Sequence, residues 1–223
     1  MGNTYKAIKS KHYIQNLIEE GEHEHQDFKY QISDARKIAR SISAFANNSG
    51  GRLLIGVKDN GNIAGVESDE EIYMIEQAAT MYCRPSQQVT FSIYKVEGKI
   101  VLKVDIAPAT SRPVQAQDDD RKWRAYYRVA DENILAHPLQ VKLWRRINEN
   151  DDGAQFTFSK VSHGLIDYIS QSGGVTVDDC MKQMHISRAA VEDMVIALCR
   201  MGAAAMDYSD GRFLIIAKAA GMQ

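Results

Sequence analysis

The sequence predicts an α+β protein: a mixed β-sheet with flanking helices over residues 1–148, followed by a small winged-helix domain over residues 156–223. Three observations predict this fold. Helical periods alternate with short apolar runs in the first part. A polar stretch, ENDDGAQ at 149–155, has the composition of a flexible linker between domains. Beyond it, three helical patterns precede two strands, which is the winged-helix order.

The first part begins with a helical pattern at 13–18 that Gly21 would end. The clearest helix follows Ser33 and Asp34, which are N-cap residue types, and it ends at Gly50 and Gly51. Its apolar face consists of Ala35, Ile38, Ala39, Ile42 and Phe45. The run RLLIGV then predicts a buried strand, and we expect the two glycines to allow close packing of helix against sheet.

The rest of the first part is predicted to contain a helix, a hairpin, a loop, a further strand and a closing helix. Residues 69–82 suggest a helix, and QVTFSIYKVEGKIVLKVDI alternates as a hairpin with its turn at EG. The stretch APATSRPVQAQDDDRKW contains two of the four prolines and an acidic run, which predicts an exposed excursion. RAYYRV predicts a further strand, and HPLQVKLWRRIN predicts a helix that closes the domain.

The second part has helical patterns at 160–171, 175–183 and 187–201, then a strand, a Ser-Asp-Gly turn and a strand. The third helix is the candidate recognition helix, with Ser187 as its N-cap and with Ser187 and Arg188 as groove contacts. Residues 156–223 carry six cations and seven carboxylates, and Glu192 and Asp193 follow Arg188. DNA binding and protein contact, including dimerisation, therefore both stay open for this part.

Composition limits the function classes. Lys and Arg number 27 against 29 Asp and Glu, so nucleic-acid binding requires a local basic patch. Cys83, Cys180 and Cys199 lack C-x-x-C spacing, which argues against disulfides and cysteine zinc sites and fits a reducing cytoplasm. An apolar leader and a membrane-spanning run are both missing from the sequence, so we expect neither export nor membrane insertion.

The segment RKWRAYYR supplies the local patch. It interleaves cations, which neutralise phosphate, with aromatic rings, which stack on bases. The preceding Asp118, Asp119 and Asp120 could instead pair with these cations and leave a solvated loop. The nucleic-acid-contacting candidates here are Arg121, Lys122, Trp123, Arg124, Tyr127 and Arg128.

The segment GEHEHQDFK at 21–29 is a second candidate site. Grouped carboxylates can hold Mg²⁺ or Mn²⁺, and His23 and His25 could add nitrogen ligands. Glu22, Glu24 and Asp27 could instead only complement a helix N-terminus. Strand alternation places Phe28 and Lys29 on opposite faces, so Lys29 points toward a phosphate or a carboxylate. When no metal is bound, close carboxylates should raise a neighbour's pKa or pair with Lys29.

Together, GEHEHQDFK, ISAFANNSGGRLLIGVKDNGNIAGV and AYYRVADENILAHPLQV resemble the Schlafen-related Alba-like domain of bacterial regulators, once described as a divergent AAA group, over roughly residues 14–146. The resemblance implies nucleic-acid binding, and in relatives a winged helix often follows. Animal Schlafen domains include RNA-cleaving members, and their acidic motif corresponds to Glu22, Asp27 and Asp59. Asp27 stands where relatives usually have Glu, so its reach toward a metal is shorter by one methylene.

The leading hypothesis is a cytoplasmic, homodimeric transcription regulator that binds nucleic acid, DNA rather than RNA, with no cofactor. Its phosphate contacts come from Lys29, Arg121, Arg124 and Arg128, and its groove contacts from Ser187 and Arg188. The alternative is a ribonuclease that uses Mg²⁺ or Mn²⁺ held by Glu22, Asp27 and Asp59. A protein-interaction module is the third hypothesis, because the net charge is low.

Overall fold

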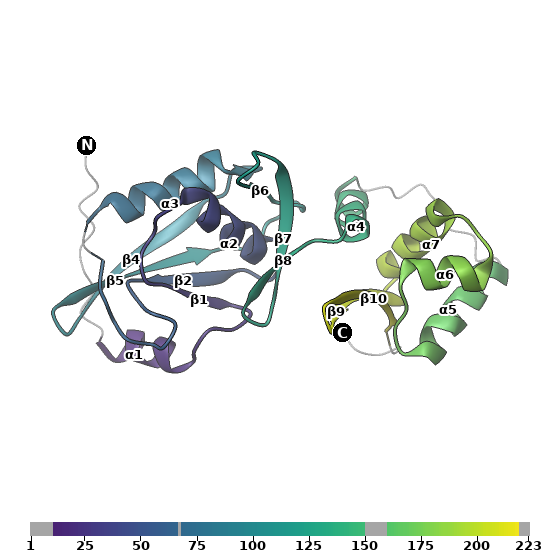
Figure 1. The fold of residues 1–223 in the computed structure, drawn as a ribbon, viewed down its shortest axis with the longest axis horizontal. Coiled ribbons are helices and arrows are strands. Elements are labelled where there is room, and N and C mark those ends of the chain that lie inside the picture. Colours follow the sequence, from purple (N-terminus) through teal and green to yellow (C-terminus); the bar gives the residue numbers. More distant parts are fainter. Residues whose placement is uncertain (1–10, 67, 150–159, 219–223) are drawn as a thin grey trace. The chain divides into compact units, whose positions relative to one another are not determined.

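The computed structural model describes residues 11–66, 68–149 and 160–218. They form two compact units, Met1–Ala136 and His137–Gln223, which are considered separately (Figure 1). Both units mix helices with strands, so the predicted α+β class is confirmed.

The main sheet of the first unit is mixed. Its order is β1-β2-β5-β4, with β1 and β2 parallel and the other pairs antiparallel. Helix α1 covers one face and helices α2 and α3 cover the other (Figure 1). The elements are α1 (Lys11–Glu19), β1 (Gln26–Lys29), α2 (Ala35–Asn47), β2 (Gly51–Ile55), α3 (Glu70–Met81), β4 (Val89–Val96) and β5 (Lys99–Ile106).

Strand alternation in β2 explains the two layers. Leu54 packs toward α1, whereas Leu53 and Ile55 pack toward α2 and α3, and all three are fully buried. Helix α2 begins where predicted, because the Asp34 side chain accepts a hydrogen bond from the Arg36 amide at 2.8 Å. Phe45 on α2 lies against Gly51, so the expected close packing of helix on sheet is confirmed.

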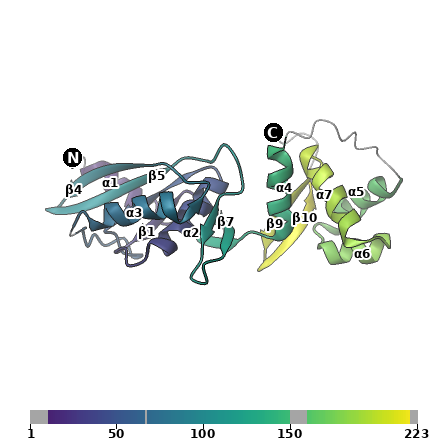
Figure 2. The same ribbon diagram turned by 90° about the horizontal axis from the view of Figure 1, so that it is seen from above.

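A second sheet of the first unit has the order β3-β6-β7-β8. One of its faces packs on α2, which lies beside β7 in both views (Figures 1 and 2). Residues 107–123 are therefore not only an exposed excursion: Val114 and Ala116 are buried, and the Asn47 side chain binds both backbone groups of Val114 at 2.8 Å. The strands are β3 (Cys83–Arg84), β6 (Gln115–Gln117), β7 (Trp123–Val129) and β8 (Glu132–Leu135).

The second unit contains the predicted three helices and hairpin, and one helix more. The added helix is α4, which was expected to close the first domain; Leu139 and Leu143 instead pack into the core of the second unit. The division falls before His137 rather than at 149–155, and residues 150–155 of that expected linker lie outside the described residues. The elements are α4 (Pro138–Asn148), α5 (Lys160–Ser172), α6 (Val177–Met184), α7 (Arg188–Arg200), β9 (Ala204–Ser209) and β10 (Arg212–Ala217).

All three cysteines are free, as the sequence predicted. Burial raises the pKa of the Cys83 thiol to about 12, so this thiol is a core residue rather than a nucleophile. Within the described ranges, the helices are all too short or too polar to cross a bilayer.

Candidate nucleic-acid interface

Strand β7 places the side chains of the segment RKWRAYYR on two opposite faces of the second sheet. Neighbouring side chains of a strand point to opposite faces, and residues directly opposite in a ladder share a face. Arg124 pairs with Ala116, and Ala116 pairs with Cys83, both of which pack toward α2. Arg124 and Arg128 therefore point to the α2 side, and Trp123 and Tyr127 point to the other side, here called the outer face.

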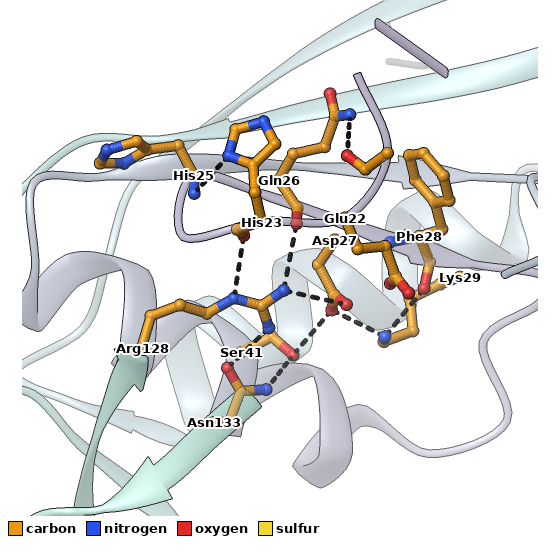
Figure 3. Close-up of polar contacts among 11 residues, drawn as sticks. Glu22, His23, His25, Gln26, Asp27, Phe28, Lys29, Ser41, Arg128 and Asn133 are labelled. Carbon is orange, nitrogen blue, oxygen red and sulfur yellow. Dashed lines mark hydrogen bonds and ion pairs between the residues drawn. The ribbon is translucent and has the colours of Figure 1, made fainter. Parts of the chain in front are cut away.

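Arg128 is a structural residue of the core. Its exposed fraction is 2%, and its Nη2 lies 3.4 Å from Oδ1 of Asp27. The guanidinium also donates to the backbone oxygens of His23 (3.3 Å) and Gln26 (3.1 Å) and to Oδ1 of Asn133 (3.1 Å) (Figure 3). The predicted phosphate contact by Arg128 is thus corrected. The guanidinium is buried and its N–H groups face four oxygen atoms inside the fold, so it is not accessible to a ligand.

Arg124 is also paired with a carboxylate, which is the alternative that the run Asp118–Asp120 left open. Its Nε lies 2.6 Å from Oδ2 of Asp118, and the other oxygen of Asp118 accepts from the Lys122 amide at 2.7 Å. The next carboxylate, Asp119, lies 2.7 Å from Nη2 of Arg40 on α2. The acidic run therefore neutralises two arginines on the α2 side of the sheet and shapes the β6–β7 turn.

The outer face keeps the remaining candidates. Trp123 and Tyr127 are half-buried there, and Arg121 and Lys122 are exposed in the β6–β7 turn. Arg84 of β3 joins them, because its guanidinium carbon lies 4.4 Å from the centre of the Trp123 ring. Sequence reasoning missed Arg84, whose position in the chain is far from RKWRAYYR; only the pairing of β3 through β6 to β7 brings it there.

The acidic cluster contains Glu22 and Asp27 beside Lys29 (Figure 3). Nζ of Lys29 lies 2.7 Å from Oδ2 of Asp27 and donates to the Phe28 oxygen at 2.8 Å. Burial, and after it a hydrogen bond with Asp27, raises the pKa of Glu22 above its ordinary value, although the Phe28 amide donates to it at 2.8 Å. Both expected outcomes, a raised pKa and a pair with Lys29, are present.

The residues do not fit the divalent ion of the ribonuclease hypothesis. Among the residues that the structure describes, no three His, Cys, Asp or Glu side chains are grouped so that they could hold a metal. Asp59, the expected third ligand, is exposed after β2. Asp27 is already neutralised by Lys29 and Arg128, so a cation would have to displace two internal ion pairs.

The raised pKa of Glu22 predicts a pH dependence of stability. A carboxyl with a raised pKa holds its proton more firmly in the folded state, so the free energy of unfolding falls as the pH rises through and above the ordinary glutamate range. In Glu22→Gln this fall should be smaller, because the amide still accepts from Phe28 but cannot ionise. Urea unfolding at several pH values measures this pH dependence, and Glu76→Gln, at an exposed position of α3, is the control. Equal pH profiles for the Glu22 variant and the parent would contradict the prediction.

The two candidates in the second unit have structural partners. The Ser187 hydroxyl accepts from the Ala190 amide at 3.3 Å, which confirms its role as N-cap of α7. Arg188 forms an ion pair with Asp178, and its Nη1 lies 3.9 Å from Glu192. Glu192 is buried and also pairs with Lys142 of α4. Arg188 at the start of α7 is therefore paired with two carboxylates of the second unit.

The first unit is thus a mixed-sheet domain whose second sheet is fastened to α2 by buried polar contacts. The model of the Schlafen, AlbA_2 family matches residues 22–137, just over half of the chain, and the protein belongs to that family. A search of curated proteins found no match.

Two solved structures resemble the chain. One is the DIP2311 protein from Corynebacterium diphtheriae, with 22% identity, a TM-score of 0.43, and coverage of 67% of this chain and 35% of that one. The other is the N-terminal domain of a putative ATP-dependent DNA helicase RecG-related protein from Nitrosomonas europaea, with 20% identity, a TM-score of 0.39, and coverage of 59% and 97%. The chain therefore spans about a third of the length of the first structure.

Proposed function

We propose that the protein binds nucleic acid through the outer face of its second sheet and the adjoining β6–β7 turn. The observation that carries this proposal is the stack of the Arg84 guanidinium on Trp123, beside the exposed cations Arg121 and Lys122. In the described part of the chain, none of these three cations forms an ion pair with a carboxylate. Cations next to an aromatic ring are what binding of phosphate and base requires. Membership of the family supports the proposal.

The finer hypothesis, a transcription regulator that reads DNA through α7, has less support. The order of α5, the Val175 bridge to β10, α6, α7 and the hairpin β9–β10 is that of a winged helix, and we assign that fold to the second unit. Because Ser187 caps the helix and Arg188 is paired, we place nucleic-acid contact on the first unit instead. Pairing of two chains through the second unit, a cytoplasmic location and a preference for DNA stay predictions.

Replacing Arg84, Arg121 and Lys122 together with Ala should weaken binding to unrelated sequences by similar factors. Each phosphate contact contributes about 0.7 to 0.9 to the slope of log affinity against log salt, so the slope should fall by roughly 2. Fluorescence anisotropy with labelled oligonucleotides between low and moderate salt measures both quantities. Lys95→Ala, at an exposed position of β4, is the control and should change neither. If the triple variant behaves like the control, the outer face is not the interface.

A further inference from the structure

We infer that the outer face binds unpaired bases, so that the protein prefers single-stranded nucleic acid to a duplex. This inference rests on the proposed function and names the class of ligand. It starts from the layout of the second sheet, in which Arg84, Gln115, Gln117, Trp123 and Tyr127 all point away from α2. These side chains are planar at their ends, and they come from three neighbouring strands.

The width of the sheet argues against insertion into a duplex groove. Four strands, β3, β6, β7 and β8, are separated by three spacings of about 4.8 Å each, so their axes span roughly 14 Å before side chains are added. The major groove of B-form DNA is about 12 Å wide and admits a helix or a two-stranded ribbon. A four-stranded face is therefore too wide to enter the major groove of an undeformed B-form duplex, which favours bases that are not enclosed in one.

The chemistry of the face suits flat, unpaired rings. Trp123 has Arg84 held over its ring at 4.4 Å, and both groups offer planar surfaces on which a base can stack. Gln115 donates to the Trp123 oxygen at 3.3 Å and Gln117 to the Arg121 oxygen at 3.5 Å. An amide side chain has donor and acceptor positions beyond that one bond, and these positions can meet the hydrogen-bonding edge of an unstacked base.

The charge of the same region leads to the same ligand. The β6–β7 turn carries the carboxylates Asp119 and Asp120 directly before the cations Arg121 and Lys122, and the whole chain has a formal charge of −2. Phosphate attraction alone is therefore weak compared with that of a basic duplex-binding surface. Stacking contributes affinity without requiring a strong positive field, and it is available only when base faces are uncovered.

The experiment compares affinities of the full chain for labelled 20-nucleotide single strands of DNA and RNA and for the corresponding duplexes. We expect the single strands to bind at least tenfold more tightly. Trp123→Leu should weaken single-strand binding roughly 10- to 100-fold and duplex binding less than threefold, and Trp123→Phe should restore most of the loss. The chain has two tryptophans, so in Trp144→Phe the fluorescence comes from Trp123 alone and should be quenched by single strands.

The outcomes separate the inference from the proposed function. A stronger effect of Trp123→Leu on single strands, for DNA, RNA or both, supports the inference and shows which sugar is accepted. Equal or tighter binding of duplexes, with Trp123 fluorescence unchanged, overturns the inference, while a reduced salt slope in the triple cation variant would keep the proposed function. If no oligonucleotide binds to the parent chain, both are wrong.

Discussion

Replacing Arg128 with Met should lower the free energy of unfolding by about 3 to 5 kcal/mol. The side chain of Asp27 is 5% exposed, and the variant removes one of its two cations while it stays buried. The same change removes the Arg128 hydrogen bonds to the carbonyls of His23 and Gln26 and to the amide oxygen of Asn133. The two carbonyls keep only the bonds that the His23 and Gln26 backbones make with each other. Met keeps most of the side-chain volume, so the loss measured by urea unfolding reports on charge and hydrogen bonds rather than on a cavity.

Two further variants make this result specific. Arg121→Met, at an exposed position of the neighbouring turn, should change the free energy of unfolding by no more than about 0.5 kcal/mol. Asp27→Asn combined with Arg128→Met should recover part of the loss, because no buried charge then lacks its partner. A stable Arg128→Met variant with weakened oligonucleotide binding would falsify the structural role and restore Arg128 as a phosphate contact.

The segment RKWRAYYR shows how far sequence reasoning reaches. Its strand was predicted, and β7 follows it at Trp123–Val129. Period-2 alternation, applied to the same letters, would have separated Trp123 and Tyr127 from Arg124 and Arg128. It could not tell which side faces α2, because that depends on the pairing of β7 with β6 and β8. Composition alone therefore overstates the number of cations on one surface.

Other differences arise from contacts between distant segments. The stretch 107–123 is rich in proline and acids, yet Val114 and Ala116 are buried because Asn47 and α2 bind that stretch from elsewhere in the chain. The helix HPLQVKLWRRIN was predicted, but local pattern does not show which core accepts Leu139 and Leu143. The pair of Asp27 and Lys29 was foreseeable from their spacing, whereas the approach of Arg128, about a hundred residues later, was not.

Gly51→Ala should lower the free energy of unfolding by roughly 2 to 3 kcal/mol. A Cβ on Gly51 would lie 2.5 Å from Cε1 of Phe45 and closer still to Cδ1, far inside ordinary carbon contact. Phe45 is fully buried, and the Arg128 guanidinium lies 5.0 Å from the centre of its ring. The ring therefore cannot move away from the new Cβ without disturbing Arg128 and its ion pair with Asp27. At a position with free space around the Cβ, Gly→Ala would stabilise the protein, because it restricts the unfolded chain. The loss of stability that we expect here therefore comes from the contact with Phe45.

The matched control is the double variant Phe45→Leu with Gly51→Ala. Phe45→Leu alone should destabilise the parent chain through lost packing, but in the Gly51→Ala background it removes the clashing ring atoms and should cost much less. Chemical denaturation of the four chains gives the interaction energy, which we expect to be at least about 1 kcal/mol in favour of the double variant. Additive effects would mean that Gly51 is required for a reason other than the approach of Phe45. A coupling of this size would show that helix α2 and strand β2 pack as one unit through Phe45 and Gly51. The Arg128 guanidinium lies 5.0 Å from the centre of the Phe45 ring, so β7 packs on the same unit.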